Sequence, residues 1–186
     1  LQDLKDVLDW VQDHFKENKS IDTNNINLIG HSRGGGISII KASEDTRINK
    51  LITLASISDF GRRTATVGDL EEWKRTGVKY VVNGRTKQQM PHYYQFDKDF
   101  KENEDRLHIK SAEEQLNIPH LIIHGDNDTS ISINEAKELH QWSSKSELEI
   151  ITGADHVFNV KHPWGESTLS NELEKVVEAV LDFLNK

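Results

Sequence analysis

The stretch "NINLIGHSRGGGISII", residues 25–40, carries the densest structural signal in this chain of 186 residues. A short apolar run at 26–29 leads to a serine between two glycines, and three consecutive glycines occupy 34–36, where a helix begins. Glycine costs a helix interior about 1 kcal/mol relative to alanine, so a steric or chemical requirement must offset that cost. The order of strand, serine and helix predicts a sharp turn that exposes the Ser32 hydroxyl.

The turn fits the pattern G-x-S-x-G, with Gly30 and Gly34 at its ends and His31 and Arg33 at its variable positions. The pattern arises by chance in roughly one chain in twenty of this length, so its context is the stronger argument. A serine on a strained turn needs small neighbours because bulk there would meet the strand or the helix. We expect Gly30 and Gly34 to relieve this clash and the glycines at 35–36 to let the helix pack closely on a sheet.

Strand and helix signals alternate on both sides of this motif. Apolar runs typical of buried strands lie at 26–29, 50–56, 118–125 and 147–153. Amphipathic patterns typical of helices lie at 1–15, directly after Ser32, at 133–142 and at 169–184. This alternation predicts a single α/β domain over 1–186, with a mostly parallel sheet flanked by helices.

Residues 59–116 interrupt the alternation and are predicted to form a lid or insertion within the domain. The segment is polar but rich in aromatic residues. "DLEEWKRTG" is typical of a helix, and "VKYVVNGRTKQQM" predicts a hairpin that turns at Asn83 and Gly84. Its aromatic side chains either line a substrate pocket or form a small satellite core, and the sequence leaves both readings open.

The composition excludes several classes of partner and site. The net charge is -8 without a long basic cluster, which argues against nucleic-acid and anionic-membrane partners. The absence of cysteine excludes disulfides and thiolate chemistry and favours a reducing compartment, so we expect a cytoplasmic protein. No apolar run approaches the roughly 20 residues of a membrane span. His120 and His124 are four apart on a predicted strand and lack a third ligand, so no metal site is predicted.

Two further motifs follow Ser32 along the chain, and each comes after a predicted strand. They are "HGDND" at 124–128, which fits H-G-x-x-D, and "GADHVF" at 153–158. With these motifs the chain resembles the α/β-hydrolase superfamily, most of all its small esterases and acyl-peptidase-like hydrolases. The resemblance implies a catalytic triad of Ser32, Asp128 and His156 that works without a cofactor.

Other residues compete for the roles of base and acid, which a serine nucleophile needs because its hydroxyl is weakly reactive. His162 is the second choice for the base, whereas His140 falls on a predicted surface helix. Asp126 is a weaker acid because the motif places the acid two residues later. Asp155 is adjacent to His156 in sequence, so we expect the two side chains to diverge.

The resemblance covers only the later part of the family's fold, since four of its eight strands are present. The strand before Ser32 lies inside the family's sheet, so here it would leave an apolar edge open to water. We therefore expect an N-terminal segment or a partner chain to cover this strand. The resemblance also implies that the Arg33 backbone amide supplies one oxyanion-hole donor, while the early loop that supplies the other has no match.

The sequence thus predicts a serine hydrolase that cleaves a small-molecule carboxylic ester, thioester or amide through an acyl-enzyme. Since the base must be a neutral histidine, we expect the rate to rise with pH between about 6 and 7. Two alternatives remain: a non-catalytic binding protein with the α/β-hydrolase fold, and an incomplete enzyme that needs an N-terminal segment.

Overall fold

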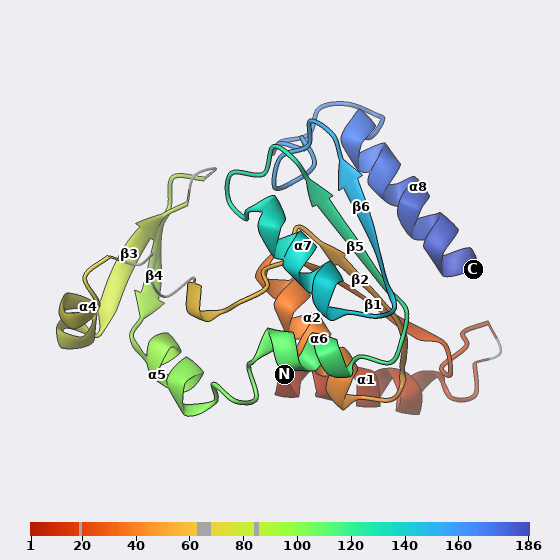
Figure 1. Cartoon of the computed structure of the whole chain (residues 1–186), viewed down its shortest axis with the longest axis horizontal. Helices are drawn as coiled ribbons and strands as arrows, with labels where there is room; N and C mark the ends of the chain where they lie inside the picture. Colours follow the sequence, from red (N-terminus) through yellow and green to blue (C-terminus); the bar gives the residue numbers. More distant parts are fainter. Residues whose placement is uncertain (19, 63–67, 84–85) are drawn as a thin grey trace. The chain divides into compact units, whose positions relative to one another are not determined.

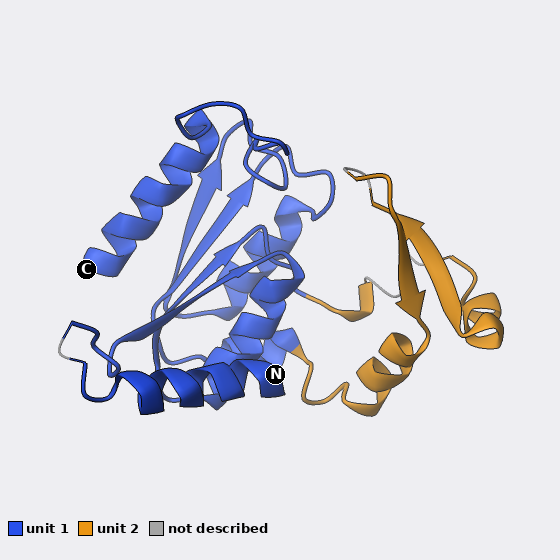
Figure 2. Ribbon diagram, turned by 180° about the vertical axis from the view of Figure 1, so that it is seen from behind, with its two compact units in different colours: residues 1–58, 109–186 blue, residues 59–108 orange. Residues whose placement is uncertain are grey.

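The computed structural model describes residues 1–18, 20–62, 68–83 and 86–186. In chain order its elements are α1 (Gln2–Phe15), β1 (Ile26–His31), α2 (Arg33–Glu44), β2 (Ile48–Leu54), α4 (Leu70–Thr76), β3 (Val78–Val82), β4 (Gln89–Tyr93), α5 (Gln95–Glu102), α6 (Ile109–Gln115), β5 (His120–Gly125), α7 (Ile133–Trp142), β6 (Ser146–Ile151) and α8 (Asn171–Asn185) (Figure 1). They form two compact units, one of residues 1–58 and 109–186 and one of residues 59–108 (Figure 2).

The larger unit is built on a four-stranded sheet in the order β1-β2-β5-β6, and every neighbouring pair is parallel. Figure 1 shows α2 and α7 on one face of this sheet and α8 on the other. The four predicted strands and the predicted parallel α/β architecture are therefore confirmed. Parallel strands need crossover connections, usually helices, that cover the faces of the sheet, and the inner strand β5 is buried along its whole length.

The apolar stripe of α8 forms the core on its face of the sheet. Val176 and Phe183 pack in one cluster with Ile52 of β2 and with Leu121 and Ile123 of β5. Successive strand residues point to opposite faces, so alternate positions of β2 and β5 reach α8. The predicted helical spacing over 169–184 thus corresponds to a helix that buries its stripe against the sheet.

The smaller unit contains α4, the antiparallel hairpin of β3 and β4, and α5. Trp73 of α4 is buried, donates its Nε1–H to the His92 carbonyl at 2.8 Å and contacts the Tyr94 ring edge-on. Tyr80 and Tyr93 are more than half exposed. The predicted helix and hairpin are confirmed, and part of the aromatic set forms a satellite core. The predicted turn residue Gly84 lies outside the described residues.

The boundary of the smaller unit differs from the predicted insertion, which extended to residue 116. The unit ends at His108, and α6 belongs to the larger unit. Ile109 and Ala112 of α6 are buried, and so is Glu113, whose Oε1 lies 2.8 Å from His120 Nδ1 on β5. Glutamate at this inward position interrupts the spacing of apolar residues that is typical of a buried helix. The sequence pattern therefore assigned this segment to the polar insertion.

Candidate active site

The three residues of the predicted triad follow three strands of the sheet. Ser32 comes directly after β1, Asp128 lies in the loop after β5 and His156 lies in the loop after β6. These strands are parallel, so their carboxyl ends meet at one edge of the sheet, where the loops of α/β folds form binding sites.

The backbone of Ser32 is held in an unusual conformation, with φ 57° and ψ −124°. A non-glycine residue with positive φ costs on the order of 1–3 kcal/mol and persists where its surroundings fix it. Here the Ser32 N–H donates to the Leu54 carbonyl at 2.9 Å, and the Ser32 carbonyl accepts from the Gly35 N–H at 3.0 Å. The end of β2 and the first turn of α2 therefore hold the predicted elbow.

Two glycines of the motif are required by close contacts, and a third is not. A Cβ on Gly30 would lie 2.4 Å from Ser38 Oγ and 2.5 Å from the Gly34 carbonyl oxygen, and one on Gly35 would lie 2.3 Å from Ser56 Oγ. A Cβ on Gly34 would meet nothing within 4 Å in the part of the chain described. The expectation that Gly34 relieves a clash is therefore wrong, because its α carbon faces open space at the start of α2.

The side chains of the predicted triad form a continuous hydrogen-bonded chain. His156 Nδ1 lies 2.7 Å from Asp128 Oδ2, and His156 Nε2 lies 3.0 Å from Ser32 Oγ. An ionised carboxylate only accepts hydrogen bonds, so Nδ1 carries the proton of the neutral imidazole. Nε2 then has its lone pair free to accept the Ser32 hydroxyl proton. Nucleophile, base and orienting acid need this arrangement.

The Asp128 carboxylate is buried and fixed on both oxygens. Its side chain is 0% exposed, whereas that of His156 is 21% exposed. Oδ1 accepts hydrogen bonds from the backbone N–H groups of Ser130 and Ile131 at 2.8 and 2.9 Å, which leaves Oδ2 for His156. Buried carboxylates are tolerated where donors surround them in this way.

The competing residues have other partners. Asp126 Oδ1 accepts from the Gly153 N–H at 2.6 Å. Asp155 Oδ1 accepts from the N–H groups of Val157 and Asn159, so it turns away from the neighbouring imidazole as expected. The ring of His140 on α7 lies 2.7 Å from Ser146 Oγ, and His162 is exposed in the loop before α8. The imidazole between a carboxylate and Ser32 is that of His156.

Two histidines contact the triad in ways that the sequence analysis missed. His31 Nε2 lies 2.9 Å from the His156 carbonyl oxygen, so the elbow is tied directly to the loop after β6. His124 Nε2 lies 3.0 Å from the Ile131 carbonyl oxygen and 3.4 Å from Asp128 Oδ2. Both residues sit inside the motifs already singled out, at the positions before Ser32 and at the start of H-G-x-x-D. No feature of their spacing shows where their rings point.

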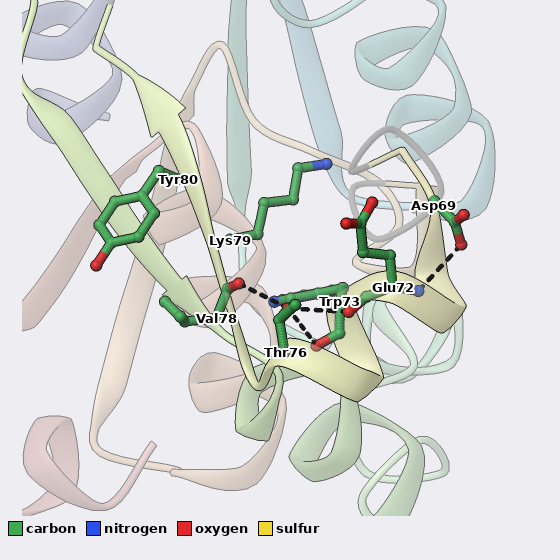
Figure 3. A pocket seen from close by; sticks show the side chains of 7 residues that line it. All are labelled: Asp69, Glu72, Trp73, Thr76, Val78, Lys79 and Tyr80. Carbon is green, nitrogen blue, oxygen red and sulfur yellow. Dashed lines mark hydrogen bonds between the residues drawn. The ribbon is translucent and has the colours of Figure 1, made fainter.

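The smaller unit has a cavity of its own, of about 260 Å³. Figure 3 shows the side chains that line it, which come from α4, β3 and the residue before α4: Asp69, Glu72, Trp73, Thr76, Val78, Lys79 and Tyr80. Asp69 caps α4 by accepting from two backbone N–H groups, and the Thr76 hydroxyl donates to backbone carbonyls. Asp69 and Thr76 thus stabilise the unit itself.

Residues 1–18, 20–62, 68–83 and 86–186 contain neither a candidate metal cluster nor a candidate membrane span. There, no group of three or more histidine, cysteine, aspartate and glutamate side chains is placed to hold a metal ion. In the same part of the chain, no helix is both long and apolar enough to cross a membrane.

Comparison with known proteins assigns a family to this arrangement. The model of the BD-FAE family matches residues 1–143. The chain belongs to the BD-FAE family. By sequence it matches none of the curated proteins compared with it. The matched region includes the elbow and the Asp128 loop but ends before His156.

Solved structures with similar folds are esterases and other α/β hydrolases. Est1E from Butyrivibrio proteoclasticus superposes with a TM-score of 0.66 at 20% identity, over 94% of this chain and 65% of Est1E. The Pyrococcus furiosus esterase Pf2001 superposes with a TM-score of 0.61 at 22% identity, over 98% of this chain and 60% of Pf2001. The α/β hydrolase GrgF from Penicillium sp. superposes with a TM-score of 0.61 at 19% identity, over 97% of this chain and 68% of GrgF. This member of the BD-FAE family therefore has the α/β-hydrolase fold and spans less than two thirds of Est1E and Pf2001.

Proposed function

We propose that this BD-FAE family member is a serine hydrolase that cleaves a small acyl substrate through an acyl-enzyme. The observation that carries the proposal is the unbroken set of hydrogen bonds from Asp128 through His156 to Ser32. Such a chain activates a hydroxyl that is otherwise a weak nucleophile near neutral pH.

Each residue has one task in the proposed reaction. Ser32 Oγ attacks the substrate carbonyl while His156 Nε2 takes its proton, and the same nitrogen then returns the proton to the leaving group. Asp128 accepts the Nδ1–H bond throughout, so it holds the tautomer and stabilises the imidazolium. A water molecule, activated by His156 in the same way, releases the acyl group and restores Ser32.

The tetrahedral oxyanion needs donors, and we assign one of them to the Arg33 backbone N–H. Arg33 is the first residue of α2 and directly follows Ser32, so its N–H lies at the N-terminal end of this helix beside the nucleophile. The positive end of the helix dipole also favours negative charge at this point. A missing oxyanion donor typically costs about 2.7–4 kcal/mol in the transition state, so full activity requires a second donor.

An ester is the favoured bond within the proposed class, because Pf2001 is an esterase and one Est1E structure holds ferulic acid. Thioesters and amides make similar demands on the triad. We propose that the smaller unit, Asp59–His108, is a lid and that the enzyme works in the cytoplasm. The absence of cysteine is consistent with that compartment.

Labelling with a fluorophosphonate tests the proposed function. This probe phosphonylates activated serines, so we expect one adduct in the intact mass, and proteolysis should map it to the peptide that contains Ser32. A chain that takes up no probe between pH 5 and 9, or takes it up elsewhere, would contradict the proposal and favour a non-catalytic binding protein.

We also propose that a further N-terminal segment of polypeptide lies along β1. In the described ranges β1 pairs only with β2, so its other backbone edge has no strand beside it. Ile29 is 51% exposed, although its register partner Ile52 is fully buried in the core beneath α8. An open apolar edge promotes association, and the greater length of Est1E and Pf2001 favours a segment of the same chain over a partner.

Hydrogen exchange and sedimentation test this proposal. Without the further segment, we expect fast exchange of the outward amides of β1 and concentration-dependent association of the 186-residue chain. Ile29→Lys should reduce the association, because a charge on an edge strand opposes pairing. Val177→Lys, at a 40% exposed position on α8, is the matched control and should leave it unchanged. A monomer with slowly exchanging β1 amides would refute the open edge, and a defined dimer would point to a partner chain.

A further inference from the structure

His124 is a fully buried residue near the end of β5, four residues before the proposed acid. Its Nε2 faces the Ile131 carbonyl oxygen at 3.0 Å and lies 3.4 Å from Asp128 Oδ2. A carbonyl oxygen only accepts hydrogen bonds, so Nε2 carries a proton. His124 Nδ1 is buried, and none of the described residues forms a hydrogen bond with it, so we assign it as the unprotonated nitrogen.

The charge state of His124 follows from this environment. Burial is the largest influence and lowers the pKa of His124 below that of an ordinary histidine. A proton on Nδ1 would bury an N–H group without an acceptor, which costs free energy. The residue therefore presents one fixed N–H donor and no charge around neutral pH.

Ile131 links this donor to the acid. Its N–H donates to Asp128 Oδ1 at 2.9 Å, while its carbonyl accepts from His124. The turn that wraps the carboxylate is thus fastened to β5 through a side chain as well as through the backbone. The Nε2 atom of His124 itself lies 3.4 Å from Oδ2, the oxygen that binds His156.

We propose that His124 is a positioning residue that holds the Asp128 carboxylate in line with His156 Nδ1. This inference rests on the proposed function, since it concerns the same acid. The imidazole Nε2–H fixes the Ile131 end of the turn and limits rotation of the carboxylate. Misplacement of a catalytic group by about 1 Å can cost about 100-fold in rate, so losing the donor should slow the reaction of Ser32.

A matched pair of substitutions isolates the donor. The side-chain amide of glutamine places an N–H near the position of His124 Nε2. The shorter side chain of asparagine places its amide only near the position of Nδ1, away from the Ile131 carbonyl. We expect His124→Asn to slow fluorophosphonate labelling of Ser32 by between about 10- and 100-fold. His124→Gln should retain the labelling rate to within a few fold. His120→Asn removes a second fully buried imidazole of the same strand, bonded to Glu113 and Thr53 instead, and controls for lost stability.

Proton NMR of the His156 Nδ1–H gives a second readout that needs no reaction. Its strongly hydrogen-bonded resonance should lie far downfield in the unmodified chain and in His124→Gln and His120→Asn, and should move upfield in His124→Asn. Equal labelling rates and unchanged resonances across the variants would overturn the inference. An unreactive Ser32 with the expected resonance shifts would support the positioning role of His124 and contradict the proposed function. Normal labelling of every variant would support the proposed function and refute the positioning role of His124.

Discussion

Ser32→Ala is expected to reduce kcat for p-nitrophenyl acetate by about a million-fold, because no acyl-enzyme can form without the hydroxyl. Removal of the nucleophile from such a triad costs as much as removal of all three members, since the three act as one unit. The imidazole of His156, which lies 3.0 Å from Ser32 Oγ, then has no proton to take. Substrate hydrolysis at saturating and at limiting substrate, in protein with unchanged thermal stability, measures the effect.

Ser43→Ala is the matched control for this loss. Ser43 lies on α2, the helix that follows Ser32, and its hydroxyl donates to the Ile40 carbonyl at 2.9 Å. Its substitution should leave kcat unchanged and alter stability slightly, since a single hydrogen bond contributes about 1 kcal/mol. Hydrolysis that persists in Ser32→Ala at the rate of the unmodified chain would rule out the covalent mechanism.

Asp128→Asn is expected to lower kcat by about 10,000-fold with little change in KM. The amide of asparagine can donate to Nδ1, which would force the His156 proton onto Nε2 and leave that nitrogen unable to accept from Ser32. The size of the effect follows the loss seen when a triad acid is replaced by its amide, where the geometry survives and the tautomer is wrong. Steady-state kinetics, together with the labelling rate of Ser32, measures it.

Asp126→Asn provides the comparison for the acid. Asp126 precedes the acid by two residues in the same loop, and its Oδ1 accepts one N–H from Gly153. Asparagine keeps that acceptor, so kcat should remain within a few fold of the unmodified value. If the two substitutions have equal effects, the loop as a whole matters and the assignment of Asp128 as the acid fails.

Local sequence patterns were sufficient to predict the sheet and to place the residues of the candidate site at one edge of it. β1, β2, β5 and β6 each carry a short apolar run that stands out among polar loops, and β5 is buried along its whole length. Ser32, Asp128 and His156 each follow one of these strands, and parallel strands bring their carboxyl ends together. The three motifs could therefore be placed at one edge without knowledge of any distance.

The limit of the smaller unit was not predictable from such patterns. Glu113 occupies an inward position of α6 and is buried against His120, although glutamate ordinarily marks an exposed position. The pairing joins residues from two elements, and only their packing shows that the charge is satisfied. A reading of α6 by apolar spacing alone therefore assigns the helix to the polar segment before it.

The glycines around Ser32 show the same difference between what local sequence patterns determine and what tertiary packing decides. The sequence by itself determined that a strand, a serine and a glycine-rich helix start follow one another, because backbone preferences and apolar periodicity are local properties. Only the tertiary structure decided that Gly30 and Gly35 are pressed against neighbouring atoms while Gly34 is not, and that His124 reaches the turn around Asp128. Such contacts depend on how closely separate elements approach and on where a ring points, and neither is encoded in the spacing of residues along the chain.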